Sequence, residues 1–294
     1  MNGGFTYSEV IGSEDAGLAL SAYLSSRYGH TLQTEWDERI AEGLVTVDGR
    51  PGAPGSTLKA GQSVAWNRPP WEEPEAPLDY AVLHQDAALL AVGKPSGLPT
   101  LPGAGFLEHT LLHQVRLRFP GASPAHRLGR ATSGVVLFAL DGAAAKALER
   151  SWRERRVSKV YRALLQGRPG RDSFVVDAPI GPVPHPRLGT VHALSPAGKP
   201  ARSAAVVLER RAAASLAEVS IDTGRPHQIR IHMAAAGHPL AGDPLYAAGG
   251  GVRPDAVPGD GGYLLHALRV GLSHPITGAP FEVSCPAPAA LDVT

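Results

Sequence analysis

The sequence predicts an α+β protein whose main sheet is mixed or antiparallel, preceded by a small α/β domain. Strand-like runs occur in groups with helices inserted between them, whereas a strictly alternating order would indicate a parallel α/β fold. Hydrophobic residues make up 43% of the 294 positions and charged residues 19%, as in ordinary globular chains. With 34 glycines and 27 prolines, we expect many turns and no long uninterrupted helices.

A proline-rich segment divides the chain. NRPPWEEPEAP at 67–77 contains four prolines, which fix φ and remove backbone donors, so a helix or central strand is not expected there. We therefore expect a small domain at 1–66, a linker at 67–78 and a large domain at 79–294.

Composition excludes several classes of protein. Cys285 is the single cysteine, so an intrachain disulfide and a cysteine-based zinc site are excluded. No run approaches the roughly 20 apolar residues of a membrane-spanning helix, and the first residues do not resemble a secretory signal. These features indicate a cytoplasmic protein, and we expect a monomer.

Charge is distributed unevenly, although the formal net charge is only +1. Nine basic residues lie between Lys146 and Arg171, opposed there by Glu149 and Glu154. Such a band can attract a polyanion, or it can be a solvated helix face.

The first 66 residues predict two helices followed by short strands. Ser13 is a candidate N-cap for a helix that runs to residue 30, and a second helix ends near Gly43. The dipeptide Asp48-Gly49 predicts a turn between short strands, and 61–67 predicts another strand.

The rest of the chain predicts a strand-rich domain. Alternating or continuous apolar runs predict strands at 89–94, 134–140, 159–167, 201–210, 216–222 and 264–272. Helical spacing predicts helices at 107–119, 142–155 and 227–237, and Asp141 is placed to cap the second of them.

Five motifs in this domain follow one another in a recognisable order. They are VLHQDAALLAVGKPSGLPTLPG (82–103), HRLGRATSGVVLFAL (126–140), SKVYRALLQG (158–167), IDTGRPHQIRIHMAAAGHPLAGDPLY (221–246) and LLHALRVGLSHPITGAPFEVSCPAP (264–288). Together they resemble the RluA-type RNA pseudouridine synthases. The first 66 residues resemble an S4-type RNA-binding domain, although cations are sparse there.

The resemblance implies a fold, a reaction and a set of site residues. The fold is the pseudouridine synthase catalytic fold. The reaction breaks the N1–C1′ bond of a uridine in rRNA or tRNA, turns the base and rejoins it through C5, with no cofactor and no metal. The nucleotide must leave its stack first. Arg127 then fills the vacated space, Tyr161 stacks on the uracil, and Arg230 pairs with a catalytic aspartate. Four further positions are implied to bind RNA or line the pocket: Lys94, His126, Arg225 and His227.

One position departs from the family pattern. The fourth residue of HRLGR is aspartate in the family, and here it is Gly129, which has no group to attack the sugar or remove a proton. Another carboxylate, Asp222 or Asp243, could reach the pocket; the chain could be an RNA-binding homologue without turnover; or Gly129 could be a point substitution. HRLGR also resembles a divergent branch of the family found in some photosynthetic lineages. A small-molecule enzyme using the same pocket is the alternative from another class.

Plainer structural roles compete with these assignments. Tyr161 could be ordinary strand packing, and Arg230 could extend from an amphipathic helix into solvent. His227 and His232 are five residues apart and do not share a helical face, so they do not predict a metal site. Residues 132–134 are expected to serve only as turn residues before a strand.

Two geometric expectations follow. Arg127, Tyr161 and Arg230 should converge around an empty space where a side chain at 129 would project. Arg230 should have recruited a substitute partner near Gly129, either an anion, a relocated Asp or Glu, or water, because a buried unpaired guanidinium costs several kcal/mol.

Overall fold

The computed structural model describes residues 1–29, 31–256 and 261–293. The chain forms two compact units, Met1–Glu73 and Pro74–Thr294. The division falls inside the proline-rich segment, and the residues before it belong to the first unit. Trp71 accepts a hydrogen bond from the backbone N–H of Asn2, and its own N–H donates to Asn2 Oδ1 (both 3.1 Å). Among the described residues, no helix is both long and apolar enough to cross a bilayer.

The first unit is a small antiparallel sheet with two helices. Its strands are β1 (Phe5–Val10), β2 (Val45–Val47), β3 (Arg50–Pro51) and β4 (Ser63–Arg68), in the order β1-β4-β2-β3, and its helices are α1 (Leu20–Arg27) and α2 (Gln33–Ala41). Trp36 and Leu20 are fully buried at its centre with Val64.

The start of α1 differs from the expectation. Ser13 does not cap it, because the helix begins at Leu20, seven residues later. Gly17 adopts a φ of 95°, which interrupts helical geometry before that point. Strand β1 was not predicted either.

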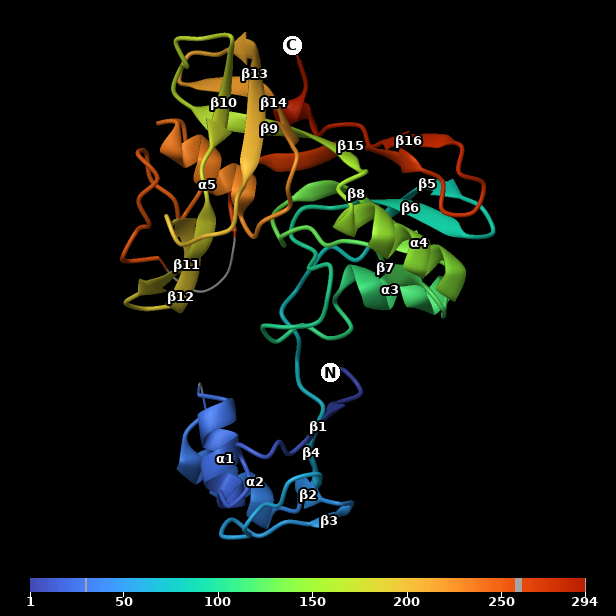
Figure 1. Ribbon diagram of the computed structural model, residues 1–294, viewed down its shortest axis with the longest axis vertical. Helices are drawn as coiled ribbons and strands as arrows, with labels where there is room; N and C mark the ends of the chain where they lie inside the picture. The colour runs from blue at the N-terminus through green and yellow to red at the C-terminus, as the bar shows by residue number, and fades with distance from the viewer. Residues whose placement is uncertain (30, 257–260, 294) are drawn as a thin grey trace. The chain divides into compact units, whose positions relative to one another are not determined.

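A ten-stranded mixed sheet dominates the described part of the second unit (Figure 1). The strands of its main path follow the order β10-β13-β14-β9-β15-β8-β6-β5, with β16 paired to β15 and β7 to β8. Their bounds are β5 (Ala81–Gln85), β6 (Leu89–Lys94), β7 (Ser123–Pro124), β8 (Ser133–Ala139), β9 (Ser158–Gln166), β10 (Ser173–Asp177), β13 (Arg202–Arg210), β14 (Ala214–Ile221), β15 (Leu265–Ser273) and β16 (Pro280–Ser284). This arrangement confirms the α+β class.

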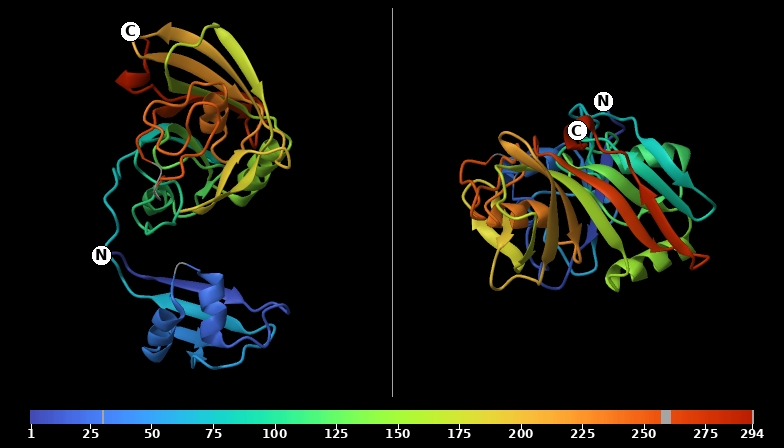
Figure 2. Two further views of the ribbon diagram at one scale, coloured as in Figure 1. Left: turned by 90° about the vertical axis from the view of Figure 1, so that its left-hand side faces the viewer. Right: turned by 90° about the horizontal axis from the view of Figure 1, so that it is seen from above.

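Helices and a separate hairpin complete the second unit. The helices are α3 (Leu111–Arg118), α4 (Gly142–Arg153) and α5 (Gln228–Ala235), with a short 3₁₀ turn at Ala289–Leu291, and the hairpin is β11 (Ile180–His185) with β12 (Gly189–Leu194). In Figure 2 the sheet is strongly twisted, with α3 and α4 at the β5–β6 end and α5 near the other. Asp141 caps α4 as predicted, its Oδ1 accepting from the N–H of Ala144 (2.8 Å).

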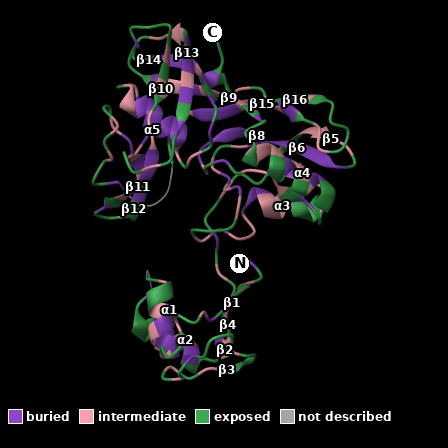
Figure 3. Cartoon of the chain, viewed as in Figure 1, coloured by how far each residue is buried: buried purple, intermediate pink, exposed green. Residues whose placement is uncertain are grey.

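The core of this unit is centred on β6 and β8. Every residue of both strands is buried, and Figure 3 shows them as part of a continuous buried layer. Strand β8 also pairs in parallel with β15, through Ser133 and Gly134. Gly134 has a φ of 109°, and a Cβ there would come within 2.2 Å of Ala267 O, so the close approach of the two strands requires glycine.

Candidate active site

The loop from His126 to Thr132 connects β7 to β8 and carries Gly129. Polar contacts to a neighbouring loop fix its backbone. Thr100 Oγ1 donates to Leu128 O (2.9 Å) and accepts from Leu128 N–H (3.1 Å). The N–H of Thr132 donates to Gly129 O (3.0 Å), which closes a tight turn around residue 129.

A cavity of about 140 Å³ opens beside this turn. Arg127, Gly129, Tyr161 and Arg230 all line it, and they come from the loop, from β9 and from α5. The predicted convergence of Arg127, Tyr161 and Arg230 around residue 129 is therefore found. None of the described residues that line this cavity is a carboxylate.

Arg230 has a carboxylate partner elsewhere. Its side chain is 2% exposed, and its Nε and Nη2 donate to the two oxygens of Asp243 at 2.8 and 2.9 Å. Asp243 Oδ1 also accepts from the backbone N–H groups of Leu245 and Tyr246 (2.9 and 3.1 Å). Asp243 thus supplies the substitute anion that was expected, and it holds the following turn as well.

Neither candidate carboxylate lines the cavity beside Gly129. The Asp243 carboxylate is fully buried and already accepts four hydrogen bonds, so it is not presented to the cavity. The Asp222 carboxylate is 61% exposed and pairs with Arg202 (2.7 Å). Asp222 lines a different, neighbouring cavity.

The space next to Gly129 is filled, contrary to expectation. The hydroxyl of Tyr263, a buried residue that precedes β15, lies 2.6 Å from the position of a Cβ on residue 129. It is 3.2 Å from Thr132 Oγ1, so Thr132 is part of the site and more than a turn residue. The guanidinium of Arg230 lies 4.2 Å from the centre of the Tyr263 ring. In the sequence, the glycine at 129 was the one sign that another side chain, here Tyr263, fills this space.

Tyr161 lies on β9, opposite Val219 on β14 and Ala267 on β15. Burial raises the pKa of its phenol to about 12, so the group stays neutral at physiological pH. A neutral ring that forms one wall of the cavity is suited to stacking and unsuited to acting as an anionic base.

Two of the residues predicted to bind RNA make structural contacts within the fold. Lys94 is 2% exposed, and its ammonium donates to Leu98 O, Pro95 O and Arg130 O (2.6, 2.8 and 3.1 Å). Burial lowers its pKa to about 7. Through these three carbonyl contacts Lys94 joins two loops.

His126 lines a neighbouring cavity as a neutral ring. Its Nε2 accepts from the N–H of Leu137 (3.1 Å), and the ring stacks on Trp152 with centroids 5.1 Å apart. Burial, with a smaller effect of Lys159, lowers its pKa to about 4. His126 therefore orients the loop and is not a cationic contact.

Arg225 and His227 lie at the edge of the cavity that Gly129 lines. Arg225 Nε donates to Pro200 O (3.1 Å). His227 adopts a left-handed conformation (φ 56°) just before α5, and its Nδ1 is 2.9 Å from the hydroxyl of Tyr246. That hydroxyl donates to His192 O (2.7 Å), which connects α5 to the β11–β12 hairpin.

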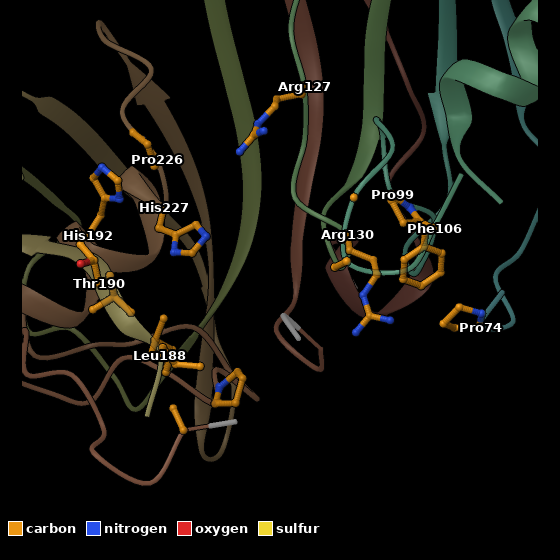
Figure 4. Close-up of a pocket in the computed structure, with 16 residues that line it drawn as sticks. Pro74, Pro99, Phe106, Arg127, Arg130, Leu188, Thr190, His192, Pro226 and His227 are labelled. Carbon is orange, nitrogen blue, oxygen red and sulfur yellow. The ribbon is translucent and has the colours of Figure 1, made fainter. Parts of the chain in front are cut away.

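Two larger cavities adjoin the first. One, of about 710 Å³, has Leu188, Thr190 and His192 of the hairpin region on one side and Phe106 and Arg130 on the other, as Figure 4 shows. The other, of about 450 Å³, is lined by basic residues near the end of α4. Arg127, which is exposed, lines all three.

The fold is that of an RNA-modifying enzyme class. Residues 88–235 match the family model described as RNA pseudouridylate synthase. The chain belongs to this family, and its similarity is to the RluA type.

Individual relatives agree with this assignment. An uncharacterized RNA pseudouridine synthase of Synechocystis is 43% identical over 92% of this chain and 94% of its own. The dual-specificity RNA pseudouridine synthase RluA of Yersinia pestis is 36% identical over 70% of this chain and 98% of its own. The structure of human RNA pseudouridylate synthase domain containing 1 is 30% identical, with a TM-score of 0.59 over 75% of this chain and 89% of its own.

Proposed function

We propose that the chain converts uridine to pseudouridine in structured RNA, either rRNA or tRNA. The observation that carries the proposal is the shared lining of one cavity by Arg127, Tyr161, Arg230 and Gly129. These are the positions that the family resemblance assigns to the reaction, and they come from three separate segments of the chain.

In this proposal each wall of the cavity has a task. The exposed guanidinium of Arg127 takes the place of the base that leaves the helix, since it lies where all three cavities meet. Tyr161 stacks on the everted uracil; such stacking contributes about 1–3 kcal/mol and tolerates rotation of the base. Arg230, neutralised by Asp243, keeps the floor of the cavity in position.

In this proposal the ribose of the everted uridine lies next to two hydroxyl groups, at the place where the family resemblance implies a carboxylate on residue 129. Tyr263 Oη and Thr132 Oγ1 are the polar atoms nearest to a side chain position on residue 129, at 2.6 and 3.5 Å. We propose that they hydrogen-bond to the ribose and hold it against the stacked base. Because loss of an essential catalytic group costs orders of magnitude in rate, turnover should be slow compared with an aspartate-bearing synthase.

We also propose that residues 1–66 form an S4-like RNA-binding module. Two helices packed on a small antiparallel sheet support this assignment. Few of its cations are free for RNA. Arg27 pairs with Glu9 (3.0 Å), and the Arg39 guanidinium lies 4.8 and 5.2 Å from the rings of Trp36 and Trp66. Its contribution to affinity should accordingly be small.

The test uses RNA from a host that lacks the gene. The RNA is incubated with the purified chain, and pseudouridines are mapped at single-nucleotide resolution. Conversion of one or a few uridines supports the proposal. Retention of RNA with a log-linear salt dependence but without conversion would mean a binding homologue that has lost turnover. Neither binding nor conversion would favour a small-molecule enzyme.

A further inference from the structure

The cavity of about 450 Å³ near the end of α4 is strongly basic. Among the described residues, its cationic lining consists of Arg127, Arg153, Arg155, Lys159 and Arg225. Asp222 is the acid in this lining, and Arg202 already holds it at 2.7 Å. The cavity thus has the charge of an anion-binding site.

Arg155 occupies an unusual backbone position in this lining. Helix α4 ends in a Schellman motif: Arg155 N–H donates to Trp152 O (3.2 Å), and Arg156 N–H donates to Ser151 O (2.9 Å). Arg155 occupies the left-handed position of the motif, with a φ of 57°. Glycine is the usual residue there, because an L side chain in this conformation is disfavoured. The fold alone therefore does not explain an arginine.

The neighbours of Arg155 are paired, and Arg155 itself is exposed. Arg156 pairs with Glu154 (2.6 Å) and Arg153 with Glu149 (3.4 Å), whereas the ion pairs found among the described residues do not include Arg155. Burial lowers the pKa of Lys159; the charge of Asp222 opposes that shift, and the smaller effect of Arg155 adds to it. The cations of this cavity repel one another, and a bound anion would relieve that repulsion.

We infer that this cavity binds phosphate groups of the RNA strand beside the everted uridine, with Arg155 as its principal contact. The inference rests on the proposed function. Arg127 and Tyr161 line both this cavity and the one at Gly129, so a strand whose base enters the second passes the mouth of the first. The backbone strain at residue 155 is retained because the arginine binds phosphate.

Replacement of Arg155 by residues that fit its backbone tests the inference. Arg155→Gly and Arg155→Asn both suit a left-handed position and remove the charge. We expect each variant to melt about 2 °C higher than the native chain, yet to bind RNA about three- to tenfold more weakly. The plot of log K against log salt has a negative slope, and the magnitude of this slope should decrease by about 0.7 to 0.9, as for the loss of one phosphate contact.

Lys146→Gln is the matched control. It removes one positive charge from the same helix at an exposed position outside the cavity, so affinity and salt slope should stay near native. Native affinity and slope in both Arg155 variants would overturn the inference, and so would a lower melting temperature in both. A native chain that binds no RNA would instead contradict the proposed function.

Discussion

The hydroxyl of Tyr263 lies 2.6 Å from the position that a Cβ on residue 129 would take, so this hydroxyl occupies the space of a side chain at 129. Real Cβ atoms do not approach oxygen so closely, and the Tyr263 ring is held under the guanidinium of Arg230 at 4.2 Å. A glycine at 129 is therefore matched to a tyrosine at 263. Aspartate at 129 requires the Tyr263 hydroxyl to move or to be removed.

Gly129→Asp should destabilise the chain on its own, because the Tyr263 hydroxyl must move. We expect a loss of about 1–3 kcal/mol, as for an overpacked site. Gly129→Asp combined with Tyr263→Phe should recover most of that loss, since the ring carbon Cζ that remains is 4.0 Å away. Chemical unfolding of the two variants measures the difference.

The same variants report on catalysis. Tyr263→Phe alone keeps the ring under Arg230 and removes the hydroxyl, and it should lower turnover at least about tenfold. The double variant carries a carboxylate at position 129 and should exceed the native rate. Tyr80→Phe removes a hydroxyl outside the cavity and should leave the rate unchanged. Full activity in Tyr263→Phe would exclude the hydroxyl from the reaction.

The Arg230–Asp243 pair should stabilise the fold strongly. Asp243→Asn leaves a buried guanidinium without its anion and should cost about 3–5 kcal/mol of unfolding free energy. Asp222→Asn disrupts the exposed pair with Arg202 and should change stability by at most about 1 kcal/mol.

The rate of pseudouridine formation tests whether Asp222 takes part in the reaction. The Asp222→Asn variant should form pseudouridine at close to the native rate, because the Asp222 carboxylate lines a different cavity. A large loss of rate without a loss of RNA affinity would mean that Asp222 is the relocated carboxylate.

Tyr161 should act through its ring. Tyr161→Leu removes the stacking surface and should cost about 1–3 kcal/mol of transition-state stabilisation. This loss lowers kcat/KM roughly 5- to 150-fold. Tyr161→Phe should stay within about threefold of native, since the neutral phenol has no role as an ionised base. Equal losses in both variants would contradict a stacking role.

The free energy of unfolding should decrease as the pH falls below neutrality, partly because His126 becomes protonated. Its folded pKa of about 4 lies below the ordinary value near 6.5, so the unfolded state binds more protons between these values. Stability is then fully present above pH 6.5 and falls as the pH drops towards 4, by up to about 3 kcal/mol from this residue.

Urea unfolding of the native chain and of His126→Gln at pH 7 and pH 5 measures this contribution. The variant should lose less stability between the two values than the native chain. Its remaining pH dependence should have the same sign, because burial also lowers the pKa values of His232 and His266. An equal loss in both chains would show that His126 is not the titrating group.

The regular elements could be predicted from the sequence, because strands such as β6 and β8 have continuous apolar runs bounded by turns. The β11–β12 hairpin could not. Pro182 and Pro184 argue against a strand, and the structure accommodates them in a two-stranded hairpin outside the main sheet. Ser13 resembled a helix cap, but Gly17 breaks the helix that would follow.

The site could be predicted in part. Motif order identified Arg127, Tyr161 and Arg230, and the cost of an unpaired guanidinium predicted a partner that proved to be Asp243. The roles of Lys94 and Tyr263 depend on side-chain packing between segments distant in the chain, which the motifs do not encode.

We expect the native chain, with glycine at 129, to isomerise uridine. Isomerisation replaces the hydrogen on C5 of uracil with the bond to C1′. Release of tritium from RNA made with 5-tritiated uridine therefore reports the reaction directly. We expect slow, enzyme-dependent release from the native chain and faster release from Gly129→Asp with Tyr263→Phe. The absence of release from the native chain on RNA that it binds, at enzyme concentrations above that of the substrate, would show that it does not isomerise uridine.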